Sequence, residues 1–275
     1  MAMIFMDGFD YYNSSQINRK WDSSNAASFV TGVYGNGKAI QGPNSWVKNL
    51  GANVVTGFMG FHFFVPAGFG AMTICAFRDA GTVQVDLRLT ASGTLQLTRN
   101  GTVLGTSTSI LSGNTWYWIE VKVTIDPTAG VAEVRVNGIS TGWITLSGQN
   151  TRASANSYFN QVALPGSTAT YDSFHVWDTT GTINNTYIGE HAISTLFPNG
   201  AGTHTDWTKS GGTANFSRVN ENPADDDTSY NFSNTPGNID SYAFGDLVPT
   251  AGSVAAVAIN TVDRVDDASP HVIHH

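Results

Sequence analysis

The sequence predicts an all-β protein made of antiparallel strands, and three observations support that prediction. Apolar and polar residues alternate in several runs, which is the pattern of a strand with one buried face. Turn-forming residues separate these runs: the 275 residues include 29 glycines, and the hairpin dipeptide Asn-Gly occurs at 100–101 and 137–138. No stretch shows the sustained apolar period of about 3.6 residues that marks an amphipathic helix.

The clearest strands lie in the middle of the chain. Residues 83–89 and 95–99 alternate on either side of a short turn, and a second pair, 117–125 and 132–136, flanks a turn at 126–130. Short turns join antiparallel neighbours, so we expect these four strands to form a meander.

The strand that contains Trp116 is expected to have two covered faces. Alternation places Trp116 and Trp118 on one face and Tyr117, Ile119 and Val121 on the other. Because large apolar side chains occupy both faces, the beginning of this strand should be buried on both sides.

Further strands are expected on both sides of this region. The run at 58–65 is almost wholly apolar, as in a strand covered on both faces. Residues 21–29 are polar and are expected to hold a single helical turn. In the run at 171–177, strict alternation would put Tyr171, Ser173, His175 and Trp177 on one face. The other expected strands are 2–6, 45–50, 72–78 and 158–164.

The composition changes near residue 180, which divides the chain into a sandwich domain at 1–180 and a smaller β-rich region at 181–275. Strands are expected at 188–197, 239–248 and 254–262, too few to close a second sandwich. We therefore expect this region to pack on the first domain or to pair with a neighbouring subunit. The final residues look like the beginning of another strand, so the natural protein is expected to be longer.

Charge and cysteine content exclude several classes. The formal net charge of −8 argues against a nucleic-acid partner, because such proteins concentrate Lys and Arg. The single cysteine, Cys75, excludes an intrachain disulfide and is expected to be a small buried core residue. No signal peptide and no membrane-spanning apolar run is visible, so we expect synthesis in a cytoplasm without conventional export.

The sequence predicts no catalytic residues. Gly138–Gly142 matches the pattern G-x-S-x-G, but it joins two β segments, whereas a nucleophile elbow needs a strand followed by a helix. None of the four glutamates, Glu120, Glu133, Glu190 and Glu221, has an aspartate two residues later, so no E-x-D pair on one strand is available for glycoside hydrolysis. Glu120 and Glu133 alternate with core residues and are expected on solvated strand faces.

Metal and cofactor sites are likewise not predicted. Asp7, Asp10 and Asp172 would lie together if the first and last strands of the sandwich are neighbours, and would then suit calcium. The alternative is that they are ordinary turn and surface carboxylates, as we expect for the acidic run at 225–227. The terminal group His271, His274 and His275 could bind a metal adventitiously, but no second cluster of ligands accompanies it in the sequence, so a structural zinc site is not expected.

Sugar binding would require exposed aromatic platforms. Tyr11, Tyr12, Tyr34, Trp143 and Trp207 lie in or near turns and are candidates for such a platform. The alternative is that they belong to the core, where most aromatic residues of sandwiches are found.

The middle of the chain resembles the laminin-G or concanavalin-like sandwich. The similar segments are 93–97, the Asn-Gly turn at 100–101, 114–123 and 134–138, and the likeness extends from about Phe5 to Asp178. The resemblance implies an antiparallel β-sandwich of the jelly-roll type, a fold that serves lectins, glycosidases, adhesion modules and viral coat parts.

A second resemblance covers nearly the whole chain. The opening Phe5–Tyr12, with 171–181, 184–190, 196–202 and 240–247, is similar to a family of tailed-bacteriophage and prophage virion proteins. These proteins join a laminin-G-like domain to a C-terminal β region and have no assigned catalytic residues. The resemblance implies other virion proteins, such as the major capsid protein or tail proteins, and further copies of this chain as partners.

Together these observations predict a virion structural protein rather than an enzyme. The main interpretation is a capsid decoration (cement) protein that clamps adjacent capsomers. The alternative is a tail or fibre module that binds a host receptor or glycan, and a glycosidase is the third hypothesis. Repeated weak contacts on a symmetric particle would supply affinity without any cofactor.

Overall fold

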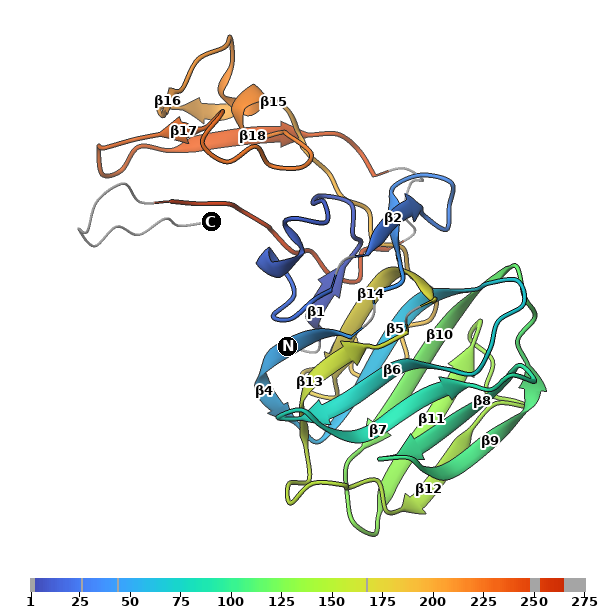
Figure 1. The fold of residues 1–275 in the computed structure, drawn as a ribbon. Coiled ribbons are helices and arrows are strands. Elements are labelled where there is room, and N and C mark those ends of the chain that lie inside the picture. The colour runs from blue at the N-terminus through green and yellow to red at the C-terminus, as the bar shows by residue number, and fades with distance from the viewer. Residues whose placement is uncertain (1–2, 26, 44, 167, 248–252, 265–275) are drawn as a thin grey trace. The chain divides into compact units, whose positions relative to one another are not determined.

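The computed structural model describes residues 3–25, 27–43, 45–166, 168–247 and 253–264 (Figure 1). The chain divides into two compact units, Met1–Ile193 and Ser194–His275. Residues 186–193 belong to the first unit and are hydrogen-bonded to its strands.

The first unit contains an eight-stranded antiparallel sheet. Its order is β12-β11-β10-β5-β14-β3-β2, and β1 also pairs with β14. The strands are β1 (Met3–Asp7), β2 (Ser28–Thr31), β3 (Lys38–Gln41), β5 (Thr56–Val65), β10 (Thr115–Thr124), β11 (Gly130–Val136), β12 (Thr145–Gln149) and β14 (Thr170–Asp178).

A six-stranded antiparallel sheet, ordered β4-β13-β6-β7-β8-β9, forms the second layer (Figure 1). Its strands are β4 (Trp46–Val54), β6 (Met72–Asp79), β7 (Thr82–Leu89), β8 (Thr94–Arg99), β9 (Thr102–Ile110) and β13 (Phe159–Leu164). A 3-10 turn, η1 (Ile17–Arg19), lies between β1 and β2. Among the described residues, no helix is long and apolar enough to cross a membrane.

The core lies between the two sheets. Phe61 and Ile119 contribute from the larger sheet, Phe77 and Leu87 from the smaller one, and Cys75 is fully buried among them. The all-β class and the antiparallel sandwich predicted from the sequence are therefore confirmed. Ile119 and Val121 face the core while Trp118 faces the opposite side, as the alternation predicted.

The predicted four-stranded meander is wrong. β7 pairs with β8, and β8 pairs with β9. The strand β9 covers the polar stretch 102–110 and was not predicted. The chain then changes sheets, because β10 pairs with β5 and β11 in the other layer. Alternation within a strand reports its faces and not the sheet it joins, which depends on long-range pairing.

The predicted common face in β14 is also wrong, because a bulge interrupts the alternation. The register with β5 shifts between Asp172 and His175, and the φ of Ser173 is 50°, in the left-handed region. Tyr171 consequently faces the core and donates a hydrogen bond to the Ile74 carbonyl oxygen (2.6 Å), whereas His175 and Trp177 face the opposite side.

The second unit holds two small sheets. β15 (Pro198–Thr205) pairs with β18 (Asp240–Phe244), and β16 (Thr208–Lys209) pairs with β17 (Asn231–Phe232), with a 3-10 turn, η2 (Asn215–Arg218), between them in sequence. β18 lies within the strand predicted at 239–248, of which residue 248 falls outside the described residues.

Three local predictions are wrong. The helical turn lies at η1 instead of 21–29, and residues 188–197 and 254–262 form no strand. Both of the latter runs are apolar enough for a strand, but neither is assigned a strand partner in the described chain. Local propensity is a weak predictor where long-range pairing decides the outcome.

Candidate functional site

The candidate site lies on the face of the larger sheet that points away from the core. Register fixes its rows: Phe64 is opposite Trp116, His62 opposite Trp118, and Gly60 opposite Glu120 across β5 and β10. On the other side of β5, Asp172 of β14 is opposite His62. Aromatic and ionisable side chains therefore occupy adjacent positions on this outer face.

Residues 186–193, here called the strap, cross this face without forming a strand. The indole N–H of Trp177 donates to the Thr186 carbonyl oxygen at 2.9 Å. The Tyr187 hydroxyl donates to Glu133 Oε2 at 2.7 Å, and its ring contacts the Arg135 guanidinium, 3.6 Å from the ring centroid.

The middle of the strap is bound to Glu120. Its Oε1 accepts the backbone N–H groups of Ile188 and Gly189, each at 3.0 Å. The backbone N–H of Ile193 donates to Ser173 Oγ at 3.1 Å. Backbone donors of a segment that joins no sheet are thus satisfied by side chains of the sheet.

Tyr34 and His62 meet Glu190 of the strap, next to the segment that Glu120 binds. His62 Nε2 lies 3.1 Å from Glu190 Oε1 and 3.3 Å from the Tyr34 hydroxyl, which donates to the same carboxylate oxygen at 3.1 Å. Burial lowers the pKa of His62, although Glu190 opposes that shift. The hydrogen bond from His62 lowers the pKa of Glu190. At neutral pH this arrangement fits a neutral imidazole that donates from Nε2 to a carboxylate.

Three buried polar atoms beneath the strap have no hydrogen-bond partner among the described residues: His62 Nδ1, Trp118 Nε1 and Glu120 Oε2. The rings of His62 and Trp118 are 5.0 Å apart, and His175 lies 5.8 Å from Trp118 on its other side. Two acceptors and one donor therefore lie close together in a buried place, where unsatisfied polar groups are costly.

Gly60 lies between the large rings of this face. A Cβ at this position would lie 2.9 Å from Trp118 Cζ2 and 2.9 Å from Trp177 Cη2. The ring of Trp177 is in turn stacked on Phe58, with 5.1 Å between centroids. Only glycine leaves room for both indoles at this point of the sheet.

Beyond the strap, the aromatic face continues to Phe64 and Trp116. Their ring centroids are 5.4 Å apart, and both side chains are partly exposed. Next to this pair, His62 contacts the half-exposed Tyr34 and the carboxylate of Glu190. This end of the face combines ring surfaces with hydrogen-bonding groups that solvent can reach.

The structure does not gather the three aspartates considered for calcium. β1 and β14 are neighbours, but the buried Asp7 carboxylate accepts hydrogen bonds from Phe9 N (2.9 Å), Tyr12 Oη (2.6 Å) and Trp21 Nε1 (2.8 Å). Within the described ranges, no group of three or more His, Cys, Asp or Glu side chains is arranged to hold a metal ion.

The other two aspartates hold the loop between β2 and β3. Asp10 Oδ1 accepts the N–H of Lys38 at 2.7 Å, and Asp172 Oδ2 accepts the N–H of Val33 at 2.8 Å. Burial raises the pKa of Asp172 to about 6; the bond from Val33 lowers it, and the charge of Asp10 raises it.

The expectation that Glu120 is solvated is wrong, since it is 1% exposed beneath the strap. Glu133 is partly exposed, with Lys122 Nζ 3.5 Å from its carboxylate. The G-x-S-x-G segment follows β11 as a turn and precedes β12, with no helix after it. Glu221 lies in the second unit and accepts a hydrogen bond from Ser229 Oγ at 2.7 Å.

The aromatic candidates separate into different environments. Tyr12 is buried, and Tyr11 and Trp143 are partly buried against the core. Trp207 belongs to the second unit, where its indole donates to the Asn238 carbonyl oxygen at 3.1 Å. Of the five, only Tyr34 joins the candidate site. The terminal group His271, His274 and His275 lies outside the described residues.

Sequence reasoning missed the importance of His62, Trp118, His175 and Glu190. The only available signal was an ionisable residue within the apolar run of β5, namely His62. Nothing in the sequence indicates that Glu190, distant along the chain, would reach it.

No protein-family model and no curated protein matches the chain. Solved structures do resemble it. A PL-14 alginate lyase from Aplysia kurodai has a TM-score of 0.48 and 13% identity over 64% of this chain and 99% of its own. An alginate lyase from a Chlorella virus has a TM-score of 0.45 and 11% identity over 62% and 99%. A carbohydrate-binding module from Bacillus subtilis has a TM-score of 0.35 and 11% identity over 57% and 94%. At these identities and TM-scores the likeness says nothing about function, and the two-sheet antiparallel sandwich is given by the strand pairing of this chain itself.

Proposed function

We propose that this chain is a structural protein of a bacteriophage virion, most simply a capsid decoration protein, and that its second unit makes the subunit contacts. The observation that carries the assembly role is the lack of a core in that unit. Among its described residues, no apolar side chain is buried, and Ser229 is the one buried residue. The sequence resemblance to phage virion proteins supports the proposal that the particle is a bacteriophage virion.

The second unit exposes apolar side chains instead of burying them. Val257 is 80% exposed, and Phe244, Ile239 and Val262 are each at least half exposed. A unit that buries so little cannot offset the conformational entropy that folding costs. Burial against another subunit would supply the missing stabilisation.

The small sheets offer a second means of association. In the described part of the unit, each sheet has two strands, so each strand has one edge without a sheet partner. Open edges pair readily with strands of another chain. A symmetric particle would bring such edges together in a fixed arrangement.

The proposal includes no catalytic activity. Glu120 and Glu133, the carboxylates on neighbouring strands of the outer face, both bind the strap. A glycosidase would need one of them free to act on a sugar as acid or nucleophile.

A matched pair of substitutions tests the assembly role. Ile259 in the second unit and Ile183 in the first are both 72% exposed. We expect Ile259→Asp to reduce self-association, measured by light scattering, and occupancy on particles, measured by mass spectrometry. Ile183→Asp should behave like the wild type. Equal occupancy of both variants would contradict the assignment of contacts to the second unit, and absence of the protein from purified particles would contradict the virion role.

The second candidate function is a tail or fibre module that binds a glycan. It is favoured by the partly exposed pair Phe64 and Trp116, because aromatic surface flanked by polar groups suits a sugar ring. Trp116→Ala should then reduce glycan binding, with Tyr230→Ala in the second unit as a control. Copy number per particle separates the two functions, since decoration requires many copies and a fibre few.

A further inference from the structure

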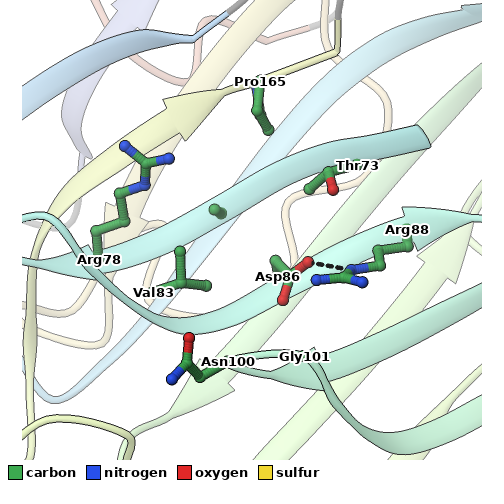
Figure 2. Close-up of a pocket in the computed structure, with 9 residues that line it drawn as sticks. Thr73, Arg78, Val83, Asp86, Arg88, Asn100, Gly101 and Pro165 are labelled. Carbon is green, nitrogen blue, oxygen red and sulfur yellow. Dashed lines mark hydrogen bonds and ion pairs between the residues drawn. The ribbon is translucent and has the colours of Figure 1, made fainter.

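Two adjoining pockets on the outer face of the smaller sheet form a basic surface. The first, of about 140 Å³, is lined by Arg78, Asp86, Arg88 and Asn100, among others (Figure 2). The second, of about 240 Å³, is lined by Arg99, Asn100, Thr102, Arg152 and Ala153. Asn100 lines both, so the two pockets adjoin at its turn.

The charges of this surface contrast with the rest of the protein. Arg78, Arg88, Arg99 and Arg152 lie here in a chain whose net charge is −8. Arg88 is neutralised by Asp86 (Figure 2). Asp86 also accepts a hydrogen bond from Thr98. The other three arginines make no ion pair within the described residues, which leaves local positive charge.

Arg78 carries the strongest sign of a missing partner. Its Nε is buried and has no hydrogen-bond acceptor among the described residues. A guanidinium N–H in this situation loses its hydration without compensation. An anionic oxygen in the first pocket would satisfy it, and planar guanidinium groups suit carboxylates well.

Arg152 has one acidic neighbour that must be considered. The pKa of Asp126 is lowered mainly by the backbone hydrogen bonds from Ala129 and Thr128, and the charge of Arg152 contributes less. Those bonds hold the Asp126 carboxylate in its own turn. Asp126 therefore does not occupy the second pocket, whose lining contains no acid.

We propose that the two pockets form a binding site for an acidic oligosaccharide, with carboxylates of successive sugar units held by Arg78, Arg99 and Arg152. Hydroxyl and amide groups of Thr73, Thr102 and Asn100 are available for sugar hydroxyls. Neither pocket is lined by an aromatic side chain, so bases of a nucleic acid would find no stacking surface. The second pocket, lined by polar and charged residues apart from Ala153, also lacks the apolar centre typical of a protein interface. This site does not depend on the proposed virion role.

The test is calorimetric titration with a galacturonate tetrasaccharide, compared with the neutral galactose tetrasaccharide. We expect only the acidic one to bind, and about 1 M salt, where the Debye length is about 3 Å, to weaken binding. Arg78→Gln and the double variant R99Q/R152Q should each lower the affinity on the order of tenfold. Arg135→Gln, on the other sheet, should leave it within about twofold, and thermal melting verifies that every variant is folded.

Several results would overturn the proposal. These are equal binding of the neutral tetrasaccharide, wild-type affinity of the arginine variants, or no binding of the acidic probe. Tighter, arginine-dependent binding of a ten-residue oligothymidylate or a hexaglutamate peptide would assign the pockets to phosphate or to an acidic protein instead.

Discussion

Glu120 Oε1 accepts a hydrogen bond from the backbone N–H of Gly189 at 3.0 Å, although the two residues are 69 positions apart in the sequence. The same oxygen accepts the N–H of Ile188. One carboxylate on β10 therefore holds the middle of the strap against the outer face of the sheet.

Glu120→Ala should release the strap. It removes the acceptor of two N–H groups, and hydrogen bonds to a charged group contribute about 1.5–3 kcal/mol each. We expect faster hydrogen exchange at 188–189 and a lower melting temperature, with the sandwich retained. Glu221→Ala, in the second unit, is the control. Unchanged exchange would show that other contacts hold the strap.

Gly60→Ala should destabilise the sandwich by about 1–3 kcal/mol, because the added methyl group would displace Trp118 or Trp177. Gly70→Ala is the matched control, since a Cβ there would have no neighbour within 4 Å. Urea denaturation of both variants measures the difference. Equal stability would mean that the indoles move aside at no cost.

Ile119→Asp should cost about 4 kcal/mol or more, or prevent folding, because it places an unpaired charge in the core. Ile110→Asp, on the exposed side of β9, should change stability by about 0.5 kcal/mol or less. Thermal melting distinguishes them, and wild-type-like melting of the first variant would refute the register of β10.

His175 should make the protein sensitive to acid. Burial lowers its pKa to about 3, with His191 and His62 adding to the shift and the Ser173 carbonyl opposing it. Below about pH 6.5 the imidazole of His175 is protonated in the unfolded chain but stays neutral in the folded chain. The free energy of unfolding therefore falls as the pH decreases toward 3. The loss is about 5 kcal/mol at its limit. In His175→Gln, the free energy of unfolding should change less between pH 7 and pH 4.5, and an unchanged slope would contradict this.

Asp172 should have the opposite dependence. Its folded pKa of about 6 exceeds the ordinary value of 3.8, so the folded state keeps a proton that the unfolded state loses. Stability therefore decreases as the pH rises from about 4 to 6 and stays reduced above it, by about 3 kcal/mol. Asp172→Asn should be more stable than the wild type at pH 7. Asp22→Asn should be less stable there, because hydrogen bonds lower the pKa of that carboxyl despite its partial burial.

Some features followed from local pattern alone. Strict alternation predicted the two faces of β10, and the apolar run at β5 predicted a strand buried on both sides, as the structure confirms. These features depend on side-chain direction along one strand, which has a period of two residues.

Other features were accessible only in three dimensions. The bulge at Ser173 puts the residues after it on the opposite face of β14 from the one that strict alternation predicts. The chain also passes from one sheet to the other between β9 and β10, so the predicted meander does not form. Both depend on pairing between segments that are distant in sequence.

The sequence by itself determined the all-β class, the antiparallel sandwich and the inward residues of its long strands, because alternation and turn chemistry are local properties. Only the tertiary structure decided that Glu120 is buried, that Glu190 reaches His62, and that Arg78, Arg99 and Arg152 surround one turn. Each of these sites joins residues from separate strands or loops, and their proximity is set by packing of the whole sandwich.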